Sequence, residues 1–231
     1  MKTHRLFAWV PALGLVATLG ACGGEQPPPQ CAVGRGDHAV RYTLKQGTGA
    51  CALKTVDIVG AQAFRVPGAN KPPTLVLKPA PLAQLAGQDP AHSVTATGDF
   101  TSEYPQEGIC AVPSMSEARQ VGTAGGAAVD RTYRWSNLII QGAAAIPGTQ
   151  WTADLEYAEA GCTATYTAVG MFPAVRCVRA NADGSMTRDP AICKQPRPGL
   201  SSIDPAFPVV CEESSNLCVL DGQPPVLIPS P

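Results

Sequence analysis

WTADLEYAEAGCTATYTAVG, residues 151–170, is the stretch that decides the fold. From Trp151 to Tyr157 every second residue is apolar, and the residues between them are polar. This period of two is typical of a strand with one buried face. Ala158–Gly161 can turn the chain, and Cys162–Val169 continues with strand-forming residues. We therefore predict a β-hairpin over this stretch.

The rest of the chain also favours strands and turns over helices. Its 231 residues include 23 Gly and 23 Pro, and Ala, Val and Thr are abundant, a composition that suits strands and turns. Helical turns are expected only at residues 81–87, between a proline and a glycine, and at 114–119, where Ser114 precedes Glu117 as in a capping box. Further strands are expected at residues 38–44, 51–59, 73–79, 133–141 and 175–179.

These patterns predict a mainly β fold, either a sandwich or an open barrel. After Ala180 the chain becomes irregular and rich in proline. We divide the folded part into a β domain over residues 31–180 and a Pro-rich, disulfide-pinned extension over residues 181–231. In the β domain, Trp135 and Trp151 are expected to fill the core.

The N-terminus has the layout of an export signal. Lys2 and Arg5 precede a 14-residue apolar stretch, residues 6–19, and small residues follow it. A helix that spans a membrane needs about 20 apolar residues, and this stretch is shorter. We therefore interpret residues 1–21 as a signal peptide that is removed.

The residues Leu19-Gly20-Ala21-Cys22 resemble the lipobox of bacterial lipoproteins. The resemblance implies cleavage between Ala21 and Cys22, a diacylglycerol on the Cys22 sulfur, and a further acyl chain such as palmitate on the new amine. The alternative is an ordinary thiol beside an ordinary cleavage site. If Cys22 carries the lipid, residues 22–30 form a short lipidated tether, and the bilayer is the partner of Cys22.

The residue after the cysteine bears on the membrane that is reached. An Asp at that place often retains bacterial lipoproteins in the inner membrane, whereas this chain has Gly23. The resemblance therefore implies that the protein is anchored to the cell outer membrane.

The cysteine count agrees with this interpretation. The chain has nine cysteines, and an odd number would leave a free thiol in an exported protein. With Cys22 lipidated, the other eight can form four disulfides in an oxidising compartment. In VVCEESSNLCVL, Cys211 and Cys218 lie symmetrically about a polar turn, so we predict a disulfide between them. No CxxC or HxxxH occurs, and we expect no metal site.

Catalytic patterns are lacking in the sequence. After the signal, the chain has two histidines, His38 and His92, and we expect both to be surface or structural residues. No GxSxG and no GxGxxG occurs, so we assign no catalytic residue and no cofactor. The 17 Lys and Arg residues are scattered among 18 Asp and Glu, which argues against nucleic acid as a partner. Arg35-Gly36-Asp37 is interpreted as a glycine turn between charges.

The lipobox, the cysteine set and the β pattern together resemble small cysteine-rich lipoproteins of myxobacteria. GCTATYTAVGMFPAVRC, residues 161–177, is similar to a recurring core motif there. The resemblance implies no known activity. Our hypothesis is a non-enzymatic role in binding, adhesion or envelope assembly, with an unknown envelope protein or ligand as partner. The alternative is an envelope hydrolase that uses His38 or His92 as its base.

Overall fold

The computed structural model describes residues 29–66, 71–143, 145–194 and 201–227. The predicted signal peptide, Cys22 and most of the predicted tether lie outside the described residues. In the described ranges, no helix has the length and apolar character needed to cross a membrane.

The described chain consists mainly of strands. The strands of the large sheet are β1 (Gly36–Gly47), β2 (Val56–Phe64), β3 (Thr74–Pro79), β4 (Ala96–Asp99), β5 (Ile109–Ser114), β6 (Ala118–Ala124), β7 (Ala127–Gln141), β8 (Gln150–Glu159) and β9 (Cys162–Met171). Two small sheets follow, made of β10 (Val178–Ala180), β11 (Met186–Arg188), β12 (Val209–Cys211) and β13 (Cys218–Leu220). The helical segments are short: η1 (Gly49–Leu53), α1 (Ala80–Ala83) and η2 (Pro190–Lys194).

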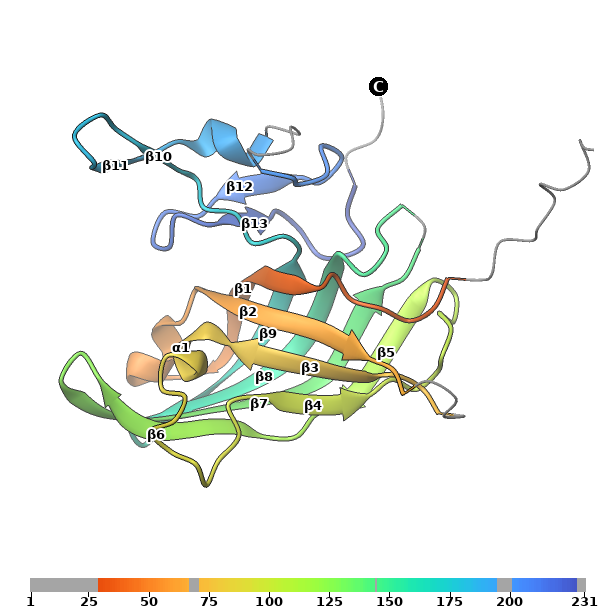
Figure 1. Cartoon of the computed structure of the whole chain (residues 1–231), viewed down its shortest axis with the longest axis horizontal. Helices are drawn as coiled ribbons and strands as arrows, with labels where there is room; N and C mark the ends of the chain where they lie inside the picture. The colour runs from red at the N-terminus through yellow and green to blue at the C-terminus, as the bar shows by residue number, and fades with distance from the viewer. Residues whose placement is uncertain (1–28, 67–70, 144, 195–200, 228–231) are drawn as a thin grey trace, which may run out of the picture.

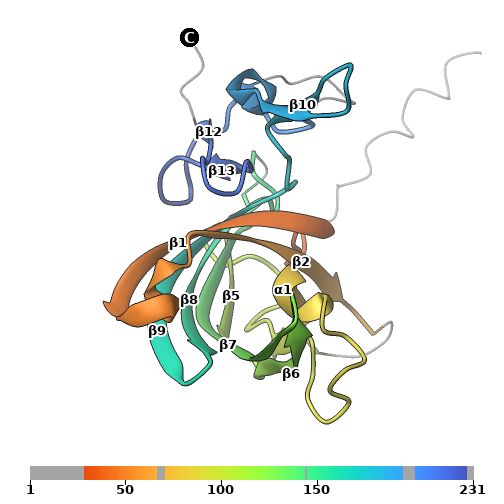
Figure 2. The same cartoon turned by 90° about the vertical axis from the view of Figure 1, so that its left-hand side faces the viewer.

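The large sheet curls into an open barrel (Figures 1 and 2). Its strand order is β4-β3-β2-β1-β9-β8-β7-β5, and β6 also pairs with β7. Every pairing in the sheet is antiparallel. Single hydrogen bonds join its two ends: Ser116 N donates to Thr97 O at 2.8 Å, and Thr101 N donates to Ala111 O at 2.9 Å. Of the two predicted architectures, the open barrel is confirmed.

The hairpin that was predicted over residues 151–170 forms as β8 and β9. The two strands pair without a break from Gln150↔Met171 to Glu159↔Cys162. The turn is Ala160-Gly161, with φ angles of 47° and 84°. Positive φ at both central residues matches the twist of antiparallel strands, and glycine adopts it without strain.

Aromatic side chains fill the barrel, and one glycine makes room for them. Trp135 and Trp151 are 2 % and 1 % exposed, which confirms that both belong to the core. Their rings meet edge to face, with centroids 6.0 Å apart. Gly170 lies opposite Trp151 in the β8–β9 register, and a Cβ on it would lie 2.0 Å from the indole Cε2. The indole therefore occupies the space that a side chain at position 170 would need.

The C-terminal part forms a small layer over the outer face of β1 and β9 (Figure 1). Val169 and Met171 end β9 with side chains that pack into a second apolar cluster with Phe207 and Val209. On β1, Ala39 is covered by Leu217 and Val219. The C-terminal part therefore covers this outer face and also Val56 and Ile58 at the start of β2. The outer face of β3 and of the later half of β2 remains open.

The eight cysteines after Cys22 form four disulfides, but the predicted bond between Cys211 and Cys218 is wrong. The bonds are Cys31–Cys110, Cys51–Cys162, Cys177–Cys211 and Cys193–Cys218. The expected hairpin exists, and Cys211 lies opposite Cys218 in it. However, both side chains point into the second cluster, where Cys177 and Cys193 also lie. The observed bonds tie the hairpin to distant segments and restrict the unfolded chain more than a bond across a short turn.

Several local predictions also need correction. Ser114–Arg119 is not helical, because its ends belong to β5 and β6, and pairing with the long strand β7 outweighs a weak capping signal. The strand expected from Cys51 begins only at Val56, because Cys51 lies in η1. By contrast, the helical turns expected at residues 81–87 are confirmed, because α1 and the turns after it cover this range.

We predict that Gly170→Ala lowers the free energy of unfolding by about 1–3 kcal/mol, because the added methyl group overpacks the core against Trp151. Gly60→Ala is the matched control: it is also a strand glycine, and its Cβ would meet no atom closer than 3.6 Å. Urea unfolding followed by tryptophan fluorescence measures both. Equal stability of the two variants would contradict this account of Gly170.

Candidate functional site

His38, one of the two histidines in the hydrolase hypothesis, is a buried structural residue. Its Nε2 lies 2.8 Å from Gly34 O, and its Nδ1 accepts a hydrogen bond from Trp151 Nε1 at 3.0 Å. Nε2 therefore carries the proton, because a carbonyl can only accept. Burial lowers the pKa of His38 from 6.5 to about 4. Both ring nitrogens are thus occupied, and the ring is neutral at pH 7.

His92 lies in the loop between α1 and β4. Its Nδ1 is 2.7 Å from Asp89 Oδ2, and its backbone carbonyl accepts a hydrogen bond from Gln120 Nε2 at 2.7 Å. Asp89 also accepts from Val121 N at 3.0 Å, so this group holds the loop against β6. The side-chain partners of His38 and His92 include no serine or threonine hydroxyl in the described part of the chain.

A buried ion pair lies at the η1 end of the barrel. Lys54 Nζ is 2.5 Å from Asp57 Oδ2, and both side chains are about one-tenth exposed. Lys54 Nζ donates to Tyr133 Oη at 2.9 Å, and the Tyr133 hydroxyl donates to Asp57 at 2.9 Å. The ammonium also lies 4.5–5.2 Å from the ring centroids of Tyr42, Tyr133 and Tyr157, within the range of cation–π attraction.

The electrostatics of this cluster follow from its burial. Desolvation lowers the pKa of Lys54, and the Asp57 carboxylate opposes that shift. Burial, together with the charge of Asp57, raises the pKa of Tyr42 and of Tyr133 well above the ordinary value. The tyrosines therefore stay protonated and act as donors. The two charges neutralise each other, and the tyrosine side chains satisfy their hydrogen bonds. We therefore interpret the pair as a structural element that closes this end of the barrel.

The interior of the barrel is packed. The space lined by Val33, Leu75, Leu77, Leu138, Ile140 and Trp151 measures about 120 Å³ and has no room for a water molecule. A barrel of this width is filled by its own side chains. A ligand would therefore have to bind on the outside.

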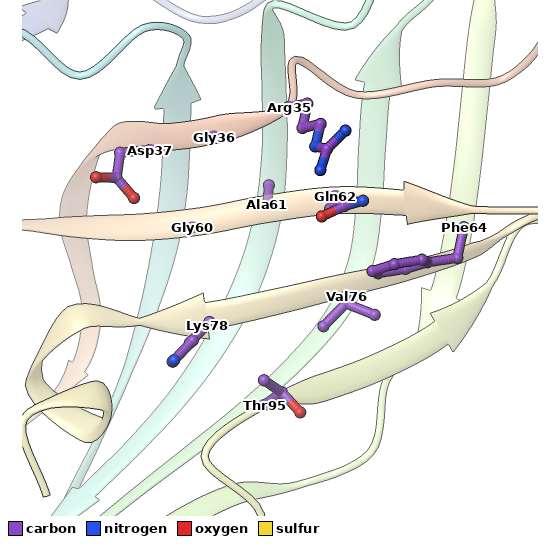
Figure 3. A pocket seen from close by; sticks show the side chains of 10 residues that line it. All are labelled: Arg35, Gly36, Asp37, Gly60, Ala61, Gln62, Phe64, Val76, Lys78 and Thr95. Atoms are coloured by element: carbon purple, nitrogen blue, oxygen red, sulfur yellow. The ribbon is translucent and has the colours of Figure 1, made fainter. Parts of the chain in front are cut away.

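The outer face of β1, β2 and β3 carries an open groove, shown in Figure 3. It measures about 760 Å³, counted out to open solvent. Phe64 and Val76 supply apolar surface, and Figure 3 shows the Phe64 ring lying along the groove toward Val76. Side chains point outward here because alternate residues of β2 and β3 face the solvent.

The polar groups of the groove lie at its rims. Figure 3 shows the Arg35 guanidinium beside Gln62, at the end of the groove that holds Phe64. Asp37 and Lys78 lie toward the other end, on either side of Gly60. A guanidinium next to an apolar strip is an arrangement that fits a ligand with an anionic group and an apolar body.

Three of the cysteine sulfurs come together without forming a metal centre. The Sγ atoms of Cys177, Cys193 and Cys211 lie within 4.8 Å of one another. All three belong to disulfides, whereas a zinc ligand is a thiolate. The cluster therefore cross-links the segments of the C-terminal part through Cys177–Cys211 and Cys193–Cys218.

The comparisons with known proteins identify the family. The family model described as MlpA matches residues 36–173, which comprise the barrel and the start of the following segment. The chain belongs to the MlpA family. It is 29 % identical to "Putative lipoprotein MlpA" of Myxococcus xanthus over 234 residues, which cover 92 % of this chain and 94 % of that protein. No solved structure matches.

This result confirms the resemblance to myxobacterial lipoproteins that the sequence suggested. Sequence reasoning placed Arg35-Gly36-Asp37 in a turn but did not find the groove that these residues line. The groove joins β1 to β2 and β3, and only strand pairing brings those positions together. The buried pair could have been predicted from the sequence, because Lys54 and Asp57 are only three residues apart and are flanked by apolar residues.

We predict that His38 makes folding stability depend on pH. The unfolded chain binds a proton near pH 6.5, whereas folded His38 binds one only near pH 4. The contribution is fully present above pH 6.5 and is lost as the pH falls toward 4, by about 3 kcal/mol in total. Urea titrations at several pH values between 7 and 5 give the free energy of unfolding at each pH. This free energy should fall less steeply with decreasing pH in His38→Gln than in the unsubstituted protein. The same pH dependence in both proteins would show that His38 is not responsible.

We also predict strong coupling between Lys54 and Asp57. Asp57→Asn leaves a buried ammonium without its counter-charge and should cost about 3–5 kcal/mol of stability. Combining it with Lys54→Met removes that unpaired charge, so the double variant should be more stable than the sum of the single effects by about 1–3 kcal/mol. A double-mutant cycle in urea measures this, and additive effects would contradict the role assigned to the pair.

Proposed function

We propose that this MlpA-family protein is a non-enzymatic binding protein, anchored to the cell outer membrane by lipid on Cys22 after cleavage at Ala21. The groove over β1, β2 and β3 is its ligand site. The observation that carries the proposal is the arrangement of Arg35 beside the apolar strip of Phe64 and Val76 on an outer face that the extension leaves open.

The ligand class follows from the lining. The apolar strip favours a hydrocarbon or aromatic body, and Arg35 favours an anionic group at the same end. Lys78 adds a second cation, while Asp37 offsets part of that charge. An anionic amphiphile therefore suits the groove better than a neutral sugar or a cation.

The hydrolase alternative has less support. His38 has both ring nitrogens engaged by Gly34 and Trp151. His92 is held by Asp89 in a loop, away from any hydroxyl among its side-chain partners in the described ranges. A general base must reach the proton that it removes, and neither environment presents a nucleophile for it to activate.

The groove is tested with 8-anilinonaphthalene-1-sulfonate, a fluorescent probe that combines an aromatic body with a sulfonate. We expect saturable binding to the full mature chain, weakened about tenfold or more in Arg35→Gln combined with Val76→Ser, because a charge-assisted hydrogen bond and apolar contact are both lost. Dodecanoate should displace the probe.

Arg134→Gln combined with Val121→Ser is the matched control, since both residues lie outside the groove and are exposed on β7 and β6. It should bind the probe as the unsubstituted chain does. The proposal fails if the groove variant retains full affinity, or if the control loses as much as the groove variant.

A further inference from the structure

The position where the tether leaves the barrel is fixed. Cys31 is bonded to Cys110, at the start of β5. Cys31 N donates to Glu103 O at 2.8 Å. The Glu103 carboxylate also pairs with Arg65, just after the end of β2. The base of the tether, the end of β2 and the loop before β5 therefore lie together at one end of the barrel.

Exposed apolar side chains surround this point. Val66 is 58 % exposed and follows Arg65, Tyr104 is 39 % exposed and follows Glu103, and Ile109 is 38 % exposed and precedes Cys110. Phe64, at 50 %, lies where the groove meets this end of the barrel. We call Phe64, Val66, Tyr104 and Ile109 the apolar collar. Each member is adjacent in sequence to Arg65, Glu103 or Cys110, the residues whose ion pair and disulfide hold this end of the barrel together.

Charged groups near the collar include both signs. Arg35 and Lys71 are exposed cations of the flanking segments. Glu103 is paired with Arg65, while Glu107 and Asp99 are exposed acids on the same side. The collar is therefore apolar at its centre, with no strong net charge around it. Aromatic and aliphatic side chains in such a setting suit the headgroup region of a bilayer.

The length of the tether brings the bilayer within reach. Residues 23–30 separate Cys22 from Cys31, and even a fully extended chain of that length spans at most about 30 Å. A lipid on Cys22 would thus hold the collar close to the membrane at a high effective concentration. At that distance, burial of exposed apolar surface favours contact with the bilayer over a free position in water.

We propose that the apolar collar rests in the headgroup region of the bilayer that holds Cys22. The inference rests on the lipid anchor of the proposed function. It orients the barrel: the collar end faces the membrane, and the end with η1 and Lys54 faces away, because β2 runs from Val56 near η1 to Phe64 at the collar (Figure 1). The Phe64 end of the groove then opens beside the membrane surface.

The test uses the lipidated mature chain in vesicles of phosphatidylethanolamine and phosphatidylglycerol, with and without a phosphatidylcholine that carries a nitroxide near its headgroup. Val66→Trp and Tyr104→Trp place a fluorophore in the collar. Met186→Trp is the control, because Met186 is 66 % exposed on β11 of the extension. Trp135 and Trp151 are buried in the core and supply a common background.

We expect the nitroxide to quench the added fluorescence of both collar variants at least about twofold more than that of Met186→Trp, since only the collar enters the headgroup region. Equal quenching in the three variants, with the protein still floating with the vesicles, would overturn the collar proposal and leave the anchor intact. Failure of the unsubstituted lipidated chain to float with the vesicles would overturn both.

Discussion

The hydrogen bond from the Trp151 indole to His38 is the interaction on which much of this structure depends. It joins β8 to β1 across β9, and the other nitrogen of His38 continues it to Gly34 O in the segment before β1. The indole can lie there only because Gly170 has no side chain. Packing and hydrogen bonding among Trp151, His38 and Gly170, on three neighbouring strands, thus fix one end of the core. The buried histidine has both ring nitrogens occupied by these contacts, so its role is structural and not catalytic.

The barrel has two ends with different chemistry. At the η1 end, the Lys54–Asp57 pair is enclosed by tyrosine rings and satisfied by their hydroxyls. At the other end, Cys31 ties the start of the folded chain to β5, and exposed apolar side chains surround it. Because the core between the two ends is packed, surface features and not an internal cavity carry the proposed binding role.

The disulfides show how far local reasoning reaches. The pattern around Cys211 and Cys218 predicted a hairpin, and the hairpin exists with the two residues opposite each other. Their bonding partners, Cys177 and Cys193, come from segments that no local pattern connects to them. Opposed positions allow a bond but do not compel one when other sulfurs share the same apolar cluster. The predicted helix at Ser114–Arg119 failed for a similar reason, since pairing with β7 outweighed a weak capping signal.

The sequence by itself determined the features that depend on neighbouring residues: the β8–β9 hairpin, through its alternation; the predominance of strands, through composition; and the resemblance to myxobacterial lipoproteins, through a short N-terminal motif together with the cysteine set and the β pattern. The tertiary structure decided everything that depends on which strands meet. Strand pairing closed the sheet into a barrel, brought Arg35, Phe64 and Val76 into one groove, and placed Asp57 against Tyr42 and Tyr133. Such contacts join residues far apart in the chain, and a local pattern carries no information about the register that brings them together.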